Sequence, residues 1–159
     1  MPSTDAPAAT ASTTKNAIRL AVSMFYFGQG LGFASWASRI PTIKADLGLS
    51  EAQLGTILLM LPIGQLLTMP LSATLVNKYG SGRILPQAAM LYALVLVLIA
   101  FSSNAWMLGA ALFLFGIFGN LSNISVNTQG VLAEDIYGRS IMSSFHGAWA
   151  LAGFTGAFF

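Results

Sequence analysis

The sequence predicts an all-α polytopic membrane protein, because most of the chain is free of charge. Four stretches without Lys, Arg, Asp or Glu hold 115 of the 159 residues: Leu20–Ser38, Ala52–Asn77, Ile84–Ala133 and Ser140–Phe159. Charged residues make up 8% of the chain, whereas soluble domains contain roughly 25%. An unpaired charge is costly in hydrocarbon, so long uncharged stretches are typical of helices that cross a bilayer.

The lengths of these stretches predict five transmembrane helices. A helix needs about 20 mostly apolar residues to cross a bilayer, so three stretches hold one helix each and the longest holds two, divided at Ser102–Asn104. We expect the helices at about residues 17–38, 51–76, 84–101, 105–133 and 140–159. The fifth is apolar up to the last residue, which favours a fragment of a longer protein.

Local signals mark the second helix. Ser50 is expected to cap its first turn, and Gln53 stands where it completes a capping box. Two prolines inside the same helix, Pro62 and Pro70, predict kinks because proline removes a backbone donor and its ring clashes with the preceding turn.

Residues 1–16 are rich in Ala, Ser, Thr and Pro and lack apolar periodicity, which predicts a disordered tail. The basic residues set the orientation, because cytoplasmic loops carry an excess of Lys and Arg. With a cytoplasmic N-terminus in the inner or plasma membrane, five cations face the cytoplasm, namely Lys15, Arg19, Lys78, Arg83 and Arg139. Only Arg39 and Lys44 then face outward.

Several classes of function find no support in the composition. The chain has no Cys and one His, so no metal site is predicted. It has no glycine-rich phosphate loop and no catalytic constellation, so we expect no cofactor and no enzyme. The net charge is only +2 and the basic residues are scattered, which argues against a nucleic-acid partner. The partner that we expect instead is the lipid bilayer.

The segment from Leu75 to Arg83 resembles the cytoplasmic loop between helices 2 and 3 of the major facilitator superfamily. The family pattern is Gly-x-Leu-Ala-Asp-Arg-x-Gly-Arg-Lys, and four positions fit it: Leu75, Lys78, Gly80 and Arg83. Ala73 and Asn77 stand where the family has Gly and Asp, and the change at Asn77 weakens a charge role there. The segments 36–41, 47–55 and 62–64, and the His146–Trp149 motif (His-Gly-Ala-Trp), are similar to a bacterial branch near the fucose-permease-like transporters.

This resemblance covers residues 17–159 and implies an incomplete N-terminal six-helix lobe, without its sixth helix and without the C-terminal lobe. It implies a secondary active transporter that moves a small polar solute, sugar-like in character, by alternating access around a central site. The partners would be that solute, a coupling proton and the missing lobe. The alternative is a truncated, non-transporting membrane interaction or regulatory subunit.

The candidate binding residues lie on two helices. Asn120, Asn123 and Asn127 are spaced to share one helix face, and amides in a membrane need a cavity or a neighbouring helix. Gln29 and Trp36 are the candidates on the first helix. We predict that these five residues form a cavity wall, the alternatives being interhelical hydrogen bonds and, for Trp36, an interfacial aromatic belt.

Three further groups carry structural or functional predictions. Gly28 and Gly32, with Gly30 between them, predict close helix packing. His146 is the only titratable side chain well inside a predicted helix, and it is either a proton relay or a packing residue. A cytoplasmic gate loop, or simply a solvated loop, is predicted from six residues: Asn77, Lys78, Gly80, Arg83, Glu134 and Arg139.

Overall fold

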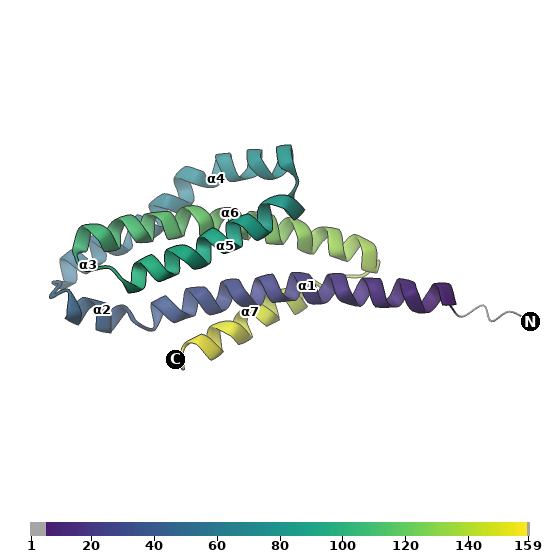
Figure 1. Ribbon diagram of the computed structural model, residues 1–159, viewed down its shortest axis with the longest axis horizontal. Helices are drawn as coiled ribbons and strands as arrows, with labels where there is room; N and C mark the ends of the chain where they lie inside the picture. Colours follow the sequence, from purple (N-terminus) through teal and green to yellow (C-terminus); the bar gives the residue numbers. More distant parts are fainter. Residues whose placement is uncertain (1–5, 159) are drawn as a thin grey trace, which may run out of the picture.

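The computed structural model describes residues 6–158, and this part of the chain is helical apart from short connections (Figure 1). Seven helices follow one another: α1 (Ala6–Ala37), α2 (Ile40–Asp46), α3 (Glu51–Leu58), α4 (Met60–Tyr79), α5 (Ser81–Ala100), α6 (Ala105–Tyr137) and α7 (Met142–Gly156). No strand occurs among the described residues. The five predicted helices correspond to α1, the pair α3 and α4, α5, α6 and α7, which confirms the all-α prediction.

Three helical segments are long and apolar enough to cross a membrane, namely Glu51–Tyr79, Ser81–Ala100 and Ala105–Tyr137. α1 and α7 form helices where two further spans were predicted. α7 has 15 residues, about 22 Å at the rise of an α-helix, which is shorter than the hydrocarbon core. α1 is long enough, but glycines and polar residues dilute its apolar face.

The first helix begins earlier than predicted. Residues 6–16, expected as part of a disordered tail, are continuous with the rest of α1, while residues 1–5 lie outside the described part. Alanine has the highest helix propensity, and extending an existing helix avoids the cost of a new nucleus. An Ala-rich segment beside a stable helix therefore joins it.

The second predicted helix divides at Leu59 into α3 and α4. Ser50 Oγ accepts a hydrogen bond from Gln53 N at 3.2 Å and Gln53 Oε1 accepts one from Ser50 N at 2.9 Å, which confirms the capping box. Pro62 lacks an N–H, and its ring crowds the carbonyl group of residue 58. The kink predicted at Pro62 is thus a break, whereas α4 continues through Pro70.

The connections between the later helices are short. Gly80 alone joins α4 to α5, with a φ of 83° that favours glycine. Asn104 caps α6 by accepting a hydrogen bond from Met107 N at 2.9 Å, and α6 begins directly after the predicted divider at Ser102–Asn104. Gly138 ends α6 in the left-handed region with a φ of 70°.

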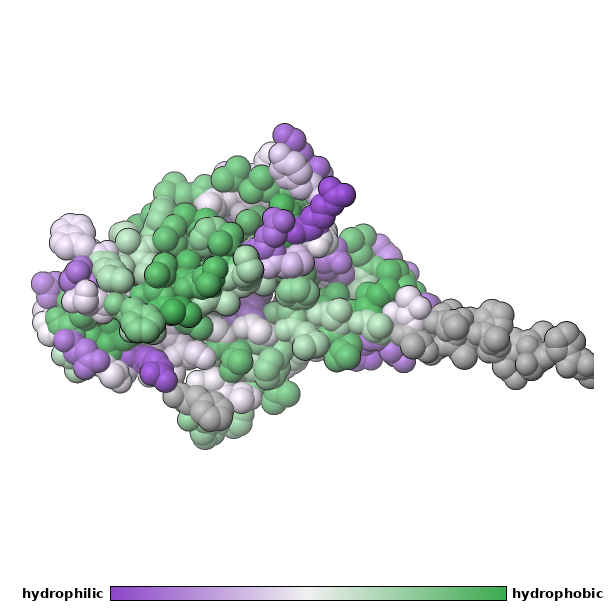
Figure 2. Space-filling model, viewed as in Figure 1, coloured by the Kyte–Doolittle hydropathy of each residue, from purple (hydrophilic) through white to green (hydrophobic). Residues whose placement is uncertain are grey.

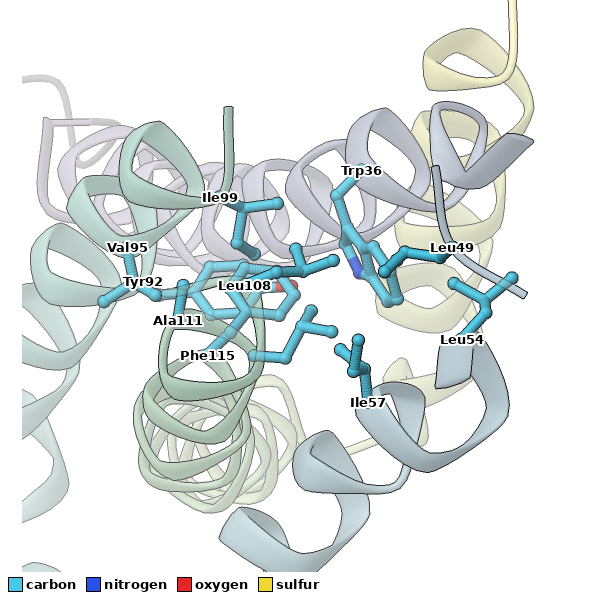
Figure 3. Packing of buried hydrophobic residues seen from close by; sticks show 11 residues of the cluster. Trp36, Leu49, Leu54, Ile57, Tyr92, Val95, Ile99, Leu108, Ala111 and Phe115 are labelled. Carbon is cyan, nitrogen blue, oxygen red and sulfur yellow. The ribbon is translucent and has the colours of Figure 1, made fainter. Parts of the chain in front are cut away.

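α6 is the central helix and contacts α1, α3, α4, α5 and α7. α1 and α7 lie side by side along its lower side in Figure 1, while α4 and α5 lie above them. The largest apolar cluster fills the end of the bundle near α2 and α3 (Figure 3), where Trp36, Leu49, Ile57, Leu112 and Phe115 are buried together.

Glycines allow α4 and α6 to approach closely. A Cβ on Gly116 would overlap the carbonyl oxygen of Leu61, and one on Gly64 would overlap that of Phe113. Two helix backbones can meet only where no side chain separates them, as in other membrane helix pairs. This crossing fixes α4 against the middle of α6.

Large apolar side chains remain exposed along the outside of the bundle. Leu66 on α4 is 70% exposed and Leu20 on α1 is 62% exposed, and Figure 2 shows apolar residues over much of the visible face. In water such a surface would be an aggregation hazard. In a bilayer it is the surface that contacts lipid, which agrees with a transmembrane bundle.

Candidate functional site

A cavity of about 310 Å³ opens between five helices, and polar and aromatic side chains line it. Its lining residues come from α1 (Gln29 and Phe33), α4 (Leu61 and Gln65), α5 (Tyr92), α6 (Phe115, Gly119, Asn120 and Asn123) and α7 (Trp149). None of these described lining residues carries a charge. The cavity is therefore an uncharged site with amides on three helices and aromatic rings on four.

The amide of Gln29 lies at the base of this cavity, where α1 meets α6. Gln29 is 9% exposed, and its Nε2 donates a hydrogen bond to the carbonyl oxygen of Gly119 at 3.3 Å. The hydroxyl of Tyr92 donates to the backbone oxygen of Gln29 at 3.4 Å. The Oε1 atom of Gln29 and the Oδ1 atom of Asn120 are buried without a hydrogen-bond partner among the described residues.

The polar face of α6 divides between two roles. Asn120 and Asn123 line the cavity, as predicted from their spacing. Asn127 lies outside the lining, and its Oδ1 accepts a hydrogen bond from the hydroxyl of Tyr26 at 2.7 Å. Its Nδ2 donates to the backbone oxygen and the Oδ1 of Asn123 at 2.8 and 3.1 Å. Asn127 thus follows the interhelical alternative, and it links the cavity to α1.

Trp36 lies elsewhere than predicted. It is 6% exposed and packs in the apolar cluster at the α2 and α3 end, where Figure 3 shows it beside Leu49. Its ring centroid is 6.2 Å from that of Phe115, in an edge-to-face arrangement. Neither the cavity wall nor an interfacial belt describes this buried position. The tryptophan that lines the cavity is Trp149, on α7.

His146 lies one turn before Trp149 on α7. Its ring is exposed and packs edge-on against the ring of Tyr26, with 5.4 Å between the centroids. Tyr26 in turn stacks on Phe145 at 5.6 Å and bonds to Asn127. The structure therefore places His146 beside the polar link to the cavity, and its role as a proton relay stays a prediction.

Of the predicted glycine packing pair, Gly32 makes a close contact and Gly28 does not. A Cβ on Gly28 would meet nothing within 4 Å, whereas one on Gly30 would overlap the backbone oxygen of Trp149. Gly32 faces the ring of Tyr92, whose nearest carbon would lie 2.9 Å from a Cβ. Gly30 and Gly32 are thus the close contacts of α1, and Gly30 brings α7 with Trp149 against α1.

The six gate-loop residues gather at one end of the bundle, and most of them belong to helices. Asn77 and Lys78 lie in the last turn of α4, Arg83 lies in the first turn of α5, and Glu134 lies in the last turn of α6. In the described part of the chain, no ion pair joins Lys78, Arg83 or Arg139 to Glu134. The predicted charge cluster is therefore not formed by direct ion pairs.

Glu134 instead caps α7. Its Oε1 accepts hydrogen bonds from the Ser140 hydroxyl at 2.8 Å, from Ile141 N at 2.6 Å and from Met142 N at 2.8 Å. The N-cap residue Ile141 has no side chain that could do this. A carboxylate at a helix N-terminus is favourable because it pairs free N–H groups and opposes the helix dipole.

Sequence reasoning missed the contributions of Tyr26, Tyr92 and Trp149. Tyr26 lies three residues before Gln29 and Trp149 lies three residues after His146, so helical spacing from known candidates indicated the first and the last. Tyr92 carried no such signal. No group of three or more His, Asp or Glu side chains that could hold a metal occurs among the described residues.

Comparison with known proteins identifies the family. The chain is 34% identical over 139 residues to an uncharacterized MFS-type transporter of Yersinia pestis, a match that covers 87% of this chain and 36% of the relative. It is 30% identical over 128 residues to an uncharacterized transporter of Sinorhizobium fredii, covering 80% of this chain and 34% of the relative. It is 33% identical over 127 residues to the membrane protein MosC of Rhizobium meliloti, a match that covers 80% of this chain and 31% of that relative.

No protein-family model and no solved structure matches the chain. The names of the relatives do not test the fucose-permease-like branch, which stays a prediction. The matches span most of this chain, whereas the chain spans about a third of the length of each relative. With its apolar helices and a relative named as an MFS-type transporter, this integral membrane chain belongs to the major facilitator superfamily.

Proposed function

We propose that this chain forms part of a secondary active transporter that moves a small polar, sugar-like solute across the inner or plasma membrane, and that it catalyses no reaction. The observation that carries this proposal is the uncharged cavity between α1, α4, α5, α6 and α7. Amides such as that of Asn123 both donate to and accept from hydroxyl groups. Aromatic rings such as that of Trp149 cover the apolar face of a sugar ring.

Alternating access supplies the mechanism that we propose. In this mechanism a second lobe, absent from residues 1–159, closes over the cavity, and the two lobes rock about the bound solute. The exposed side of the cavity, where Trp149 is 38% exposed, supports such a covering lobe. His146 packs against Tyr26, which bonds to Asn127 beside the cavity, and we include proton binding at His146 in the proposal.

Uptake by the complete transporter tests this function. Asn123 lines the cavity and is exposed to it, so Asn123→Ala should raise the KM for uptake several-fold while protein remains in the membrane at normal levels. A lost hydrogen bond contributes roughly 0.5–1.5 kcal/mol to binding. Gln87 is exposed on α5 away from the cavity, so Gln87→Ala is the control. Equal kinetics for all three proteins would contradict the binding role.

The competing function is a non-transporting interaction or regulatory subunit. The chain spans about a third of the length of its relatives, and this span alone does not favour either function. The intact mass of the native gene product separates the two functions. A mass more than double 16.7 kDa supports the transporter, whereas a mass near that value favours the subunit.

A further inference from the structure

Two side chains that line the cavity hold a hydrogen-bond acceptor without a partner among the described residues. These acceptors are the Oε1 atom of Gln29 and the Oδ1 atom of Asn120, and both are buried. Buried polar atoms are nearly always paired in folded proteins, because an unpaired one loses its bond to water without replacement. A third such atom, Nε1 of Trp36, lies in the apolar cluster, so it is the pair of acceptors on two lining residues of one cavity that points to a ligand.

The orientation of the Gln29 amide decides which hydrogen-bonding group it offers. Its Nε2 already donates to the carbonyl oxygen of Gly119. If the amide flipped, its own oxygen would face that carbonyl oxygen, and the two acceptors would repel each other. An amide can normally either donate or accept, but Gln29 is left with its acceptor alone.

The second acceptor belongs to a residue that lines the same cavity. Gln29 bonds to the backbone of Gly119, and Asn120 is the next residue along α6. Both oxygens are closed to solvent in this conformation, so bulk water does not satisfy them. The terminal torsions of Gln and Asn are broad, so the amide of a lining residue can turn when a solute binds.

We propose that Gln29 and Asn120 form a subsite that reads hydrogen-bond donors, so that the transported solute must present free hydroxyl hydrogens to this wall. The proposal rests on the proposed function and narrows its solute to a neutral polyhydroxyl compound. The cavity has no charged lining residue to neutralise an ionic solute on this side. A solute with the same ring whose hydroxyls are methylated is larger and offers acceptors only, so it leaves both oxygens unpaired.

Binding to the whole chain in lipid nanodiscs tests the subsite. Quenching of tryptophan fluorescence reports occupancy, because Trp149 lines the cavity. The probes are D-glucose, D-galactose, D-mannose and L-fucose, each paired with its fully O-methylated form. We expect at least one free sugar to bind. Its ether should bind with an affinity that is lower by about tenfold or more, because an unpaired buried acceptor has an effect of this order. Equal binding of a sugar and its ether, or binding of none of the free sugars, overturns the proposal.

Substitutions on the protein side provide a second test. Gln29→Met keeps the length of the side chain but removes its acceptor, so it should weaken sugar binding about tenfold and reduce the discrimination against the ether. Asn120→Leu should act in the same direction and serves if Gln29→Met does not fold. Gln87→Met, on the exposed face of α5, is the matched control. Discrimination that survives in both cavity variants contradicts the subsite.

Uptake by the complete transporter separates this proposal from the proposed function. If sugars and their ethers are transported equally well, the transporter function stands and the subsite is wrong. If the chain binds free sugars selectively but the complete protein transports none of them, the subsite stands and the transporter function is wrong.

Discussion

At the scale of single residues, polar side chains inside a membrane need hydrogen-bond partners within the protein, because the hydrocarbon offers none. Tyr26 is 1% exposed, and its hydroxyl bonds to Asn127, which bonds in turn to Asn123. This chain of polar groups joins α1 to α6 and ends at the cavity. Among the described residues, the exceptions are the Oε1 atom of Gln29, the Oδ1 atom of Asn120 and the Nε1 atom of Trp36, which are buried without a hydrogen-bond partner. The two amide oxygens belong to residues that line the cavity, whereas Trp36 packs in the apolar cluster.

We predict that Tyr26→Phe destabilises the bundle by about 1 kcal/mol, the net value of a typical hydrogen bond. The phenyl ring keeps the stacking on Phe145, so only the hydroxyl is lost. A double-mutant cycle with Asn127→Ala, followed by unfolding in detergent, should show that the two effects are not additive. Strictly additive effects would mean that the 2.7 Å bond contributes nothing to stability.

At the scale of elements, the helices are held by glycine contacts and by one cap that crosses a turn. Gly64 and Gly116 let α4 meet α6, and Gly30 lets α7 meet α1. These contacts constrain the width of the cavity, because they join four of the five helices that line it. The cap from Glu134 then places the start of α7 relative to the end of α6.

We predict that Gly116→Ala destabilises the bundle by roughly 1–3 kcal/mol, because the new methyl group would overlap the Leu61 backbone and force α4 away. Gly55→Ala is the matched control, since a Cβ there meets nothing within 4 Å and alanine favours the helix. Thermal unfolding in detergent should therefore give a lower Tm for the first variant and an equal or higher Tm for the second. The reverse order would contradict the close crossing of α4 and α6.

We predict that Glu134→Ala loosens the start of α7, because three donors lose their shared acceptor. Hydrogen exchange should become faster at the amides of Ile141 and Met142, with a smaller effect for Glu134→Gln, which keeps one oxygen. Asp135→Ala is the control, since Asp135 is the exposed neighbour of Glu134. Unchanged protection in Glu134→Ala would show that α7 needs no cap.

At the scale of the whole molecule, the basic residues predict the orientation in the membrane, and the exposed apolar surface indicates contact with lipid. The α4–α5 and α6–α7 connections lie at the same end of the bundle (Figure 1), and this end carries Lys78, Arg83 and Arg139. From the positive-inside rule we propose that this end faces the cytoplasm. The α5–α6 connection, which contains Ser103, would then face outward.

This orientation is tested by labelling with a membrane-impermeant maleimide. The chain has no native Cys, so each introduced cysteine reports alone and the unmodified chain is the control. Ser103→Cys should label in intact cells, whereas Ser140→Cys should label only after the membrane is permeabilised. Both positions are exposed. The opposite labelling pattern would place the N-terminus outside.

The sequence by itself determined the membrane class, the approximate positions of the five main helical segments and the capping box at Ser50. Local signals gave these results. An uncharged stretch favours a membrane helix, Ser50 and Asn104 cap helices, and Gly80 allows a turn, and each of these effects depends only on residues close by in the sequence. The early start of α1 departs from this only because an Ala-rich segment extends a helix already formed.

Only the tertiary structure decided which residues share the cavity. Helical spacing places Asn120, Asn123 and Asn127 on one face, yet Tyr26 takes Asn127 out of the lining. Helical spacing does not tell which of Trp36 and Trp149 reaches the cavity. Trp36 is buried in the apolar cluster, and Trp149 lines the cavity. A period of 3.6 residues tells which side chains point the same way on one helix, but the neighbour that a face meets depends on how all the helices pack.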